Sequence, residues 1–207
     1  DYAVKYINEY RKSKQEKPFF LYMALGSPHT PIVPSLKFQG KSPLVPYGDF
    51  VMQSDATVGA VLNALKENGL DKNTIFIFSS DNGCSKVADI DKLIQMGHYP
   101  SAQFRGSKAD LWEGGHRVPF IIRWPNGPIK AGTKSDELIS LVDVAATFAD
   151  ILQIKLPENQ AEDSFSFLAA LSGKTLNTQR KGIIHHSIWG KFAFRNKQYK
   201  LLLTPGS

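Results

Sequence analysis

The chain has little cysteine and no long hydrophobic run, which argues against a disulfide-stabilised protein and against a membrane-spanning one. Cys84 is the single cysteine among 207 residues, so no internal disulfide can form. No apolar stretch approaches the roughly 18 residues that a membrane-spanning helix needs, so we expect no membrane span. We also find no internal repeat and no low-complexity tract. What remains is an ordinary globular composition, 42% hydrophobic and 21% charged, in a chain long enough for one sizeable core.

A dense basic run with interleaved aromatic residues is also missing. The formal net charge is +6, but the lysines are scattered, so we expect no nucleic-acid partner. A positive balance of this kind suits an anionic substrate. The sequence has neither a starting Met nor a signal-peptide pattern at Asp1. This predicts a processed or trimmed amino terminus, and an export signal removed in that step is compatible with the sequence.

Continuous apolar runs at 19–25 and 75–78 predict strands of an α/β fold. Such runs are typical of parallel strands that are buried on both faces. A third short strand is expected at 120–124. Residues 31–49 are rich in Pro, Gly and Ser, and residues 84–104 lack strong periodicity, so both are predicted to be long loops.

Apolar residues at helical spacing predict helices over 2–14, from Ser54 or Asp55 to near Gly69, and over 141–152. These helices alternate with the predicted strands along the chain. The order of elements is therefore typical of an α/β domain.

The character of the chain changes after residue 157. A short helix is expected around 165–171, and Arg195-Asn196-Lys197-Gln198 is typical of a hairpin turn between two strands. We therefore predict two parts, an α/β part over 1–157 and a small subdomain with an antiparallel hairpin over 158–207.

Two polar clusters, residues 79–83 and 106–119, contain the side chains best suited to a metal and anion site. Asp81 and Asn82 follow the predicted strand 75–78, and the carboxyl ends of strands are where open α/β sheets bind ligands. A carboxylate and an amide oxygen suit Ca²⁺ or Mg²⁺. Lys108, in the second cluster, can hold an anion against such an ion, and His29, after the run 19–25, should project into the same crevice. An ordinary turn is the alternative interpretation of Asp81 and Asn82.

Together, several motifs resemble the sulfatase family, in its arylsulfatase branch of the alkaline-phosphatase-like superfamily. In chain order these motifs are Phe19 to Ala24 with Ser27-Pro28-His29-Thr30-Pro31, Asp55-Ala56-Thr57-Val58-Gly59, Ser79 to Gly83, Lys108 with Glu113-Gly114-Gly115, Arg117-Val118-Pro119, Val142 to Thr147, Asp163 to Leu168, and Leu171-Ser172-Gly173. Each motif alone is weak, but their order and spacing extend over nearly the whole chain.

The resemblance implies that the protein hydrolyses sulfate esters. It also implies an α/β fold with a mostly parallel central sheet flanked by helices and a small carboxyl-terminal antiparallel sheet. Carried over by position, Asp81 and Asn82 would ligate a divalent ion, usually Ca²⁺. Lys108 would contact the sulfate and the leaving-group oxygen, and His29 would protonate or orient the leaving group. His98 is a further candidate substrate contact, with a plain surface role as its alternative.

The sequence departs from the family at the nucleophile. Sulfatases of this family use a formylglycine made from a Cys/Ser-x-Pro-x-Arg motif, and an earlier Asp-Asp pair completes their metal site. This sequence lacks both the motif and the pair. Both lie in the family before the position of Tyr2, so we interpret the chain as a carboxyl-terminal portion of a sulfatase, with 1–157 as the end of its catalytic domain. Such a portion is incomplete at its amino terminus, inactive alone, dependent on the missing segment and prone to self-association.

The substrate is expected to be a sulfated carbohydrate or an aryl sulfate. Two alternatives stay open at this point: a phosphodiester or phosphonate hydrolase of the same superfamily, and a non-catalytic module that binds sulfated glycans. Family habit suggests a periplasmic or extracellular location.

Four further features receive structural interpretations. Cys84 is interpreted as a small buried filler rather than a nucleophile, and Glu113 and Arg117 as a structural pair. Gly114-Gly115 is interpreted as a site of close backbone packing. The neighbours His185 and His186 should point to opposite faces of a strand, so they cannot share a metal.

Overall fold

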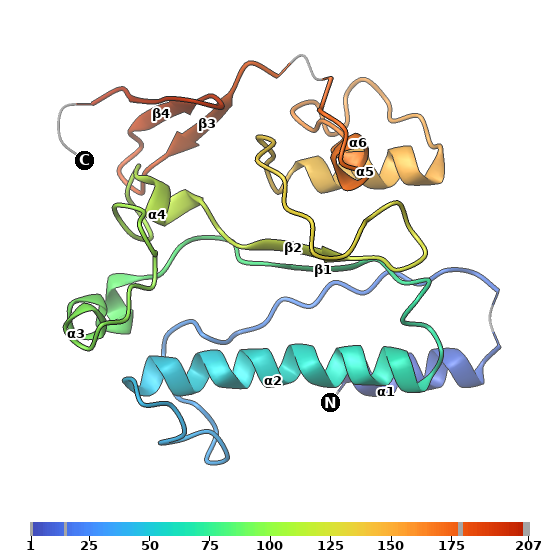
Figure 1. Cartoon of the computed structure of the whole chain (residues 1–207), viewed down its shortest axis with the longest axis horizontal. Coiled ribbons are helices and arrows are strands. Elements are labelled where there is room, and N and C mark those ends of the chain that lie inside the picture. The colour runs from blue at the N-terminus through green and yellow to red at the C-terminus, as the bar shows by residue number, and fades with distance from the viewer. Residues whose placement is uncertain (1, 15, 178–179, 205–207) are drawn as a thin grey trace.

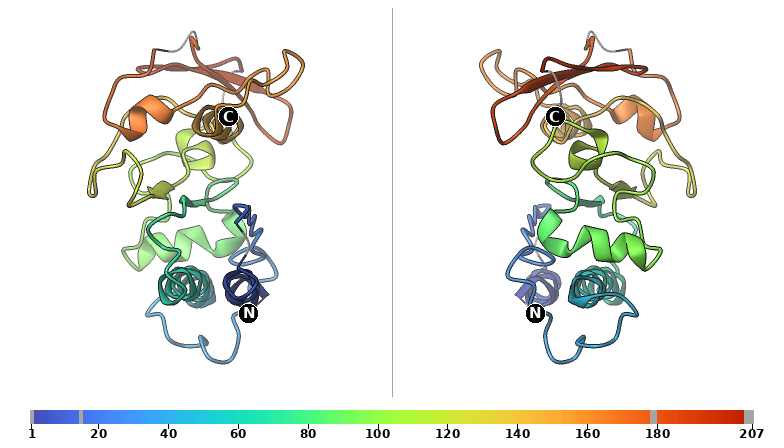
Figure 2. Two further views of the ribbon diagram at one scale, coloured as in Figure 1. Left: turned by 90° about the vertical axis from the view of Figure 1, so that its right-hand side faces the viewer. Right: turned by 90° about the vertical axis from the view of Figure 1, so that its left-hand side faces the viewer.

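The computed structural model describes residues 2–14, 16–177 and 180–204. Its helices are α1 (Tyr2–Lys12), α2 (Pro46–Glu67), α3 (Ile90–Gln95), α4 (Glu113–His116), α5 (Asp143–Leu152) and α6 (Leu168–Leu171). Its strands are β1 (Phe76–Ser79), β2 (Phe120–Arg123), β3 (Ile183–His186), β4 (Phe192–Arg195) and β5 (Lys200–Leu202). The ribbon of β1 and β2 lies between the α1–α2 pair on one side and α5 on the other (Figures 1 and 2).

The helices α1 and α2 lie side by side and form the main apolar cluster (Figure 2). Ile7 of α1 is fully buried against Val61 and Leu65 of α2. Phe19 closes the cluster, and its ring packs edge-on at 4.8 Å from the Tyr10 ring. The predicted helix over 2–14 is thus confirmed, with its end at Lys12.

The helix α2 begins earlier than the sequence predicted. Its first residue is Pro46, where proline is favoured because the first helical N–H needs no partner. Ser54, the predicted cap, is instead buried within the helix and donates to the Phe50 carbonyl. The helix ends before Gly69, whose φ of +67° favours glycine, so the predicted end is confirmed and the predicted start is wrong.

The predicted parallel sheet does not appear in the described residues. β1 and β2 form where strands were expected, but they pair antiparallel, with Phe76 opposite Arg123 and Ser79 opposite Phe120. A continuous apolar run signals burial and not the direction of pairing, which explains this error. The predicted strand at 19–25 is also wrong, because the segment has no strand assignment and leaves Phe20 74% exposed.

The segment 84–104 has more local structure than a loop. It contains a 3₁₀ turn, Lys86–Ala88, followed by α3, whose Leu93 is fully buried. Burial of one apolar side chain in a six-residue helix gives no periodic signal, which is why the sequence did not show it.

The carboxyl-terminal elements agree with the sequence prediction. β3, β4 and β5 form one antiparallel sheet in that order, and the Asn196 side chain accepts the N–H groups of Gln198 and Tyr199 in the turn between β4 and β5. The helix α6 is shorter than its predicted range. Within the described part of the chain, no helix is both long and apolar enough to cross a bilayer.

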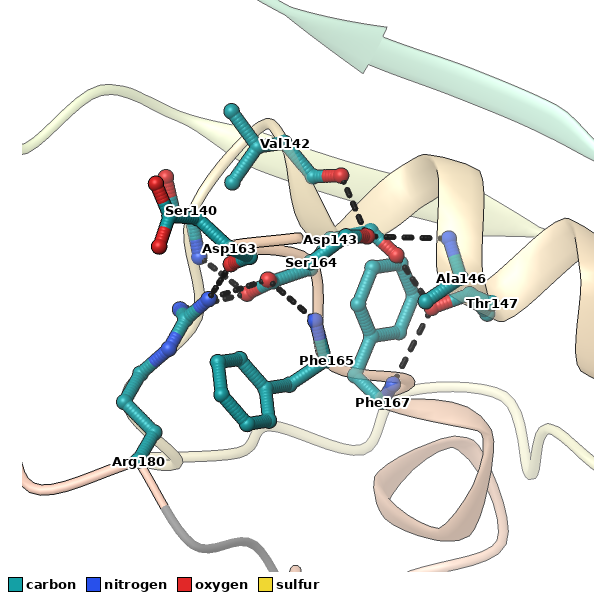
Figure 3. A network of polar contacts seen from close by, with 10 residues as sticks. All are labelled: Ser140, Val142, Asp143, Ala146, Thr147, Asp163, Ser164, Phe165, Phe167 and Arg180. Atoms are coloured by element: carbon teal, nitrogen blue, oxygen red, sulfur yellow. Dashed lines mark hydrogen bonds and ion pairs between the residues drawn. The ribbon is translucent and has the colours of Figure 1, made fainter. Parts of the chain in front are cut away.

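A buried ion pair joins α5 to the segment that precedes β3 (Figure 3). The Asp143 carboxylate receives both Arg180 guanidinium nitrogens, at 2.8 and 2.5 Å, together with the backbone N–H groups of Ser140 and Phe165. Thr147 receives the N–H of Phe167, one helical turn further along. Two motifs that are distant in sequence, 142–147 and 163–168, thus form one hydrogen-bonded unit that crosses the predicted boundary at 157.

Candidate active site

The two polar clusters meet because of the antiparallel register of β1 and β2. Ser79 pairs with Phe120, so the turn after β1 lies beside the segment that enters β2. Three hydrogen bonds extend this contact. Two join backbone groups: Gly83 N donates to Gly115 O at 3.0 Å, and Lys108 N donates to Cys84 O at 2.8 Å. The third runs from the Ser79 hydroxyl to Pro119 O at 2.9 Å. The segments 79–84 and 106–119 therefore form one structural unit.

Glycine permits this close approach. A Cβ at Gly83 would overlap the Gly114 carbonyl, and a Cβ at Gly114 would overlap the Gly106 carbonyl. A side chain at Gly115 would likewise press on the Ser107 carbonyl oxygen. The interpretation of Gly114-Gly115 as a close-packing site is therefore confirmed.

Asp81 and Asn82 occupy the turn directly after β1. The Asp81 side chain is exposed, and the Ser80 hydroxyl closes the turn by donating to the Asn82 carbonyl at 2.9 Å. The Asn82 amide nitrogen donates to Gly83 O at 3.2 Å, which leaves the amide oxygen available as a ligand. A carboxylate and an amide oxygen fit Ca²⁺ by type, but two donors fall short of the about 6 to 8 that this ion takes. Among the described residues, no group of three or more His, Cys, Asp or Glu side chains is placed to hold a metal.

The loop that carries Lys108 is fixed from within by Asp110. This carboxylate accepts the N–H of Ser107 at 2.7 Å and the N–H of Trp112 at 2.9 Å, on either side of Lys108. Gly106 and Ala109 both have positive φ, +87° and +84°. Ala109 is therefore a non-glycine residue in a sparsely populated conformation, which persists only where surrounding contacts hold it.

Glu113 begins α4 and receives three cationic side chains. Lys200 Nζ lies 3.1 Å from Oε1, Arg195 Nε lies 3.4 Å from Oε2, and Arg117 is more distant at 3.8 Å. Burial raises the pKa of Glu113, but hydrogen bonds and charge from Lys200 and Arg195 outweigh burial, so its pKa lies below the usual value. Burial lowers the pKa of Lys200, against the opposing effect of Glu113. The predicted Glu113–Arg117 pair exists, but Lys200 and Arg195 are the shorter contacts.

Two histidines stack beside this cluster. The rings of His116 and His185 are parallel, with centroids 4.3 Å apart, and His116 Nε2 lies 2.8 Å from the Asp110 carbonyl. Burial, then Lys200, then His116 lower the pKa of His185 to about 4. His186, its neighbour on β3, is exposed, which agrees with the prediction of opposite faces. Burial, then Lys200, also lower the pKa of His116, so both stacked rings are neutral near pH 7.

Cys84 lies between the two clusters but is poorly suited to attack a substrate. Its side chain is half-buried, and burial raises the pKa of its thiol despite a hydrogen bond with Tyr47. A raised thiol pKa leaves little thiolate at neutral pH, which supports the interpretation of Cys84 as a filler.

His29 and His98 are not bonded to this unit in the described part of the chain. His29 is exposed, its Nδ1 lies 2.8 Å from the Thr30 carbonyl, and its loop is tied to α2 by the Ser27 and Ser54 hydroxyls. His98 is exposed just after α3, and its N–H donates to Leu93 O. The structure therefore brings together Asp81, Asn82 and Lys108 by backbone contacts, whereas the roles of His29 and His98 stay predictions.

Comparison with known proteins identifies the chain. The Sulfatase family profile matches residues 1–154, and the profile described as N-sulphoglucosamine sulphohydrolase, C-terminal, matches residues 107–203. An N-acetylgalactosamine-6-O-sulfatase of Bacteroides thetaiotaomicron is 40% identical over 195 residues, 92% of this chain and 37% of that protein.

Solved structures agree with this result. A 6S-sulfatase structure from a Bacteroides thetaiotaomicron glycosaminoglycan locus has a TM-score of 0.82 at 36% identity, covering 98% of this chain and 44% of that one. Ps i-CgsB, in complex with k-i-k-neocarrahexaose, has a TM-score of 0.81 at 28% identity, with 97% and 44% coverage. These solved structures belong to the alkaline-phosphatase-like class of hydrolases, and the chain matches part of their fold. Within that class, the chain belongs to the sulfatase family, and it spans less than half the length of these relatives.

Proposed function

We propose that the protein is a sulfuric ester hydrolase whose substrate is a sulfated carbohydrate. The observation that carries this proposal is the backbone contact between the Asp81–Gly83 turn and the Lys108 loop. This contact supports the proposal, because it links the turn with two metal-type oxygen donors to the loop with one ammonium group. The name of the Bacteroides relative, a sulfatase of an amino sugar, supports a carbohydrate substrate. An aryl sulfate is a simpler substrate for the same chemistry.

In this proposal each side chain has one task. Lys108 supplies fixed positive charge to the sulfuryl group and the leaving-group oxygen as negative charge develops in the transition state. His29 gives a proton to the departing alkoxide, which is a poor leaving group near neutral pH without one. His98 contacts the substrate from the segment after α3.

Asp81 and Asn82 would hold the divalent ion of the family, Ca²⁺ or alternatively Mg²⁺. The bound ion would neutralise charge on the sulfate oxygens. Because these two residues supply only two donors, we propose that the remaining ligands come from outside residues 1–207. The same source would supply the formylglycine nucleophile, since the sequence contains no Cys/Ser-x-Pro-x-Arg motif.

That source is, in our proposal, a preceding segment of the same polypeptide. Its strands would build the mostly parallel central sheet next to residues 19–25. Exposed apolar side chains along this stretch, Phe20, Tyr22 and Leu25, support such a covering strand, because large exposed apolar surfaces favour association. The same surface would cause self-association when the segment is absent. The division into 1–157 and 158–207 and export from the cytoplasm stay predictions.

The reading frame that contains residues 1–207 provides the test. It should encode a Cys/Ser-x-Pro-x-Arg motif upstream of Asp1, and its purified product should release sulfate from N-acetylgalactosamine 6-sulfate. A product that cleaves a phosphodiester or phosphonate but no sulfate ester would overturn the proposal in favour of another hydrolase of the superfamily. A product that binds the sulfated sugar without turnover would overturn it in favour of a binding module.

A further inference from the structure

The Lys108 loop is attached to the carboxyl-terminal sheet at three points. Ile188, in the turn between β3 and β4, donates its N–H to the Ala109 carbonyl at 2.9 Å. Lys200 of β5 and Arg195 of β4 bind the Glu113 carboxylate. Figure 1 shows α4 lying next to the β3–β4 end of this sheet. These contacts join segments that are distant in sequence: Arg195 and Lys200 lie 82 and 87 residues from Glu113.

The attachment points lie close to Lys108 along the chain. Ala109 is its direct neighbour and has the positive φ that needs external support. Glu113 begins the short helix that ends the loop. Because α4 has only four residues, it has little stability of its own, and its position depends on its contacts.

The ion pairs at Glu113 are well placed to act as this support. The Lys200 and Arg195 side chains are 10% and 18% exposed, and the Glu113 side chain is 23% exposed. Removing one partner of such a shielded pair leaves an unpaired charge with little access to water, which favours movement of the loop. Exposed ion pairs elsewhere, such as Lys5 with Glu9, have no comparable effect because water replaces the lost partner.

We infer that Glu113 and Lys200 are positioning residues for Lys108, through which the carboxyl-terminal sheet fixes the ammonium group against the sulfate ester. This inference rests on the proposed role of Lys108. Lys200 does not touch the substrate in this account; it holds Glu113, which holds the loop. A displacement of about 1 Å is enough to lower turnover by up to 10²-fold, so a contact at this distance from the chemistry can control its rate.

A double-mutant cycle in the complete protein separates positioning from mere stability. Lys200→Met should lower kcat for an aryl sulfate roughly tenfold in the wild-type background. In a Lys108→Ala background the same substitution should lower kcat less than about twofold, because the group it positions is absent. Lys200→Arg keeps the charge and should restore most of the wild-type kcat.

The matched control is Lys197→Met. Lys197 lies in the turn between β4 and β5 and pairs with Glu137 at 2.6 Å, away from the Lys108 loop. Its loss should lower the unfolding temperature without the loss of kcat. If Lys200→Met unfolds the protein, Glu113→Gln, which keeps the side-chain volume, is taken through the same cycle.

The outcomes are distinct. Equal losses of kcat in both backgrounds, or wild-type kcat in Lys200→Met and Glu113→Gln, would overturn the positioning role. Wild-type kcat in Lys108→Ala alone would instead remove Lys108 from the site and so contradict the proposed function.

Discussion

At the scale of single residues, the side chains of the candidate site could be predicted from local sequence patterns. Asp81 and Asn82 were predictable because they follow a strong apolar run, and Lys108 because of its spacing to Glu113-Gly114-Gly115. Arg195 and Lys200 were not predictable as partners of Glu113. The hairpin pattern at the end of the chain places them on strands, but nothing local tells which distant carboxylate a strand will meet.

His29→Ala is expected to affect substrates according to their leaving groups. Sulfated sugars, whose alkoxides are poor leaving groups, should lose far more kcat/KM than activated aryl sulfates, because only the former need a proton as the bond breaks. Kinetics on a series of aryl sulfates and one sugar sulfate measure this difference. His186→Ala, an exposed histidine on β3, is the matched control. Equal losses on all substrates would show that His29 only binds.

At the scale of elements, tertiary contacts decided what local pattern could not. The sequence located β1 and β2 but not their antiparallel pairing. It predicted the start of α2 at Ser54 or Asp55, because both residue types are favoured helix caps, whereas the helix begins at Pro46. The backbones of the two clusters nevertheless contact each other. The register of Ser79 with Phe120 brings the end of β1 to the start of β2, so the antiparallel pair is what places the two clusters side by side.

The ion pair between Asp143 and Arg180 should be a major source of stability. Both side chains are buried, 1% and 7% exposed. Asp143→Ala leaves the Arg180 charge buried without its partner and should lower the free energy of unfolding by about 3 to 5 kcal/mol. Urea unfolding followed by circular dichroism measures the loss. Asp150→Ala, exposed on the same helix, should change the free energy little, and a similar small effect of Asp143→Ala would contradict the assignment.

The stacked histidines predict a loss of stability in acid. His185 has a pKa of about 4 in the folded chain, below the usual 6.5, because burial, Lys200 and His116 disfavour its charged form. Above pH 6.5 the ring is neutral in both folded and unfolded chains. As the pH falls from about 6.5 to about 4, the unfolded chain binds a proton that the folded chain does not, so stability decreases across this window.

His185→Phe tests this prediction. It keeps a ring for stacking on His116 but cannot titrate. The free energy of unfolding of this variant should depend less steeply on pH between 4 and 6.5 than that of the wild type. Glu113 and His116, whose pKa values are also lowered, remain nearby and contribute their own pH dependence in both proteins. Identical slopes would exclude His185 as the titrating group.

At the scale of the whole molecule, the chain spans less than half of its relatives, and in our proposal it holds one part of a site. The small carboxyl-terminal sheet was predictable from its hairpin turn, whereas the central sheet was not, because the stretch 19–25 has no strand partner in the described residues. An apolar run predicts burial, yet in the described residues this one leaves Phe20 and Tyr22 74% and 79% exposed.

Residues 1–207 alone are therefore expected to show no sulfatase turnover and only weak Ca²⁺ affinity. Two protein oxygens hold the ion poorly, so it should exchange readily. Calorimetric titration with Ca²⁺ and an aryl-sulfate assay on the isolated chain measure both properties. Micromolar affinity, or turnover that Asp81→Ala abolishes, would show a more complete site than the one proposed.

The central claim, that Lys108 and the Asp81–Asn82 turn belong to one sulfatase site, is tested most directly by sulfate release from the complete protein. Lys108→Ala should lower kcat for N-acetylgalactosamine 6-sulfate by on the order of 10²-fold or more, with an unfolding temperature close to that of the wild type, because it removes fixed charge from the transition state. Lys86→Ala, an exposed lysine near the turn, should retain wild-type turnover. Wild-type turnover in Lys108→Ala would contradict the claim.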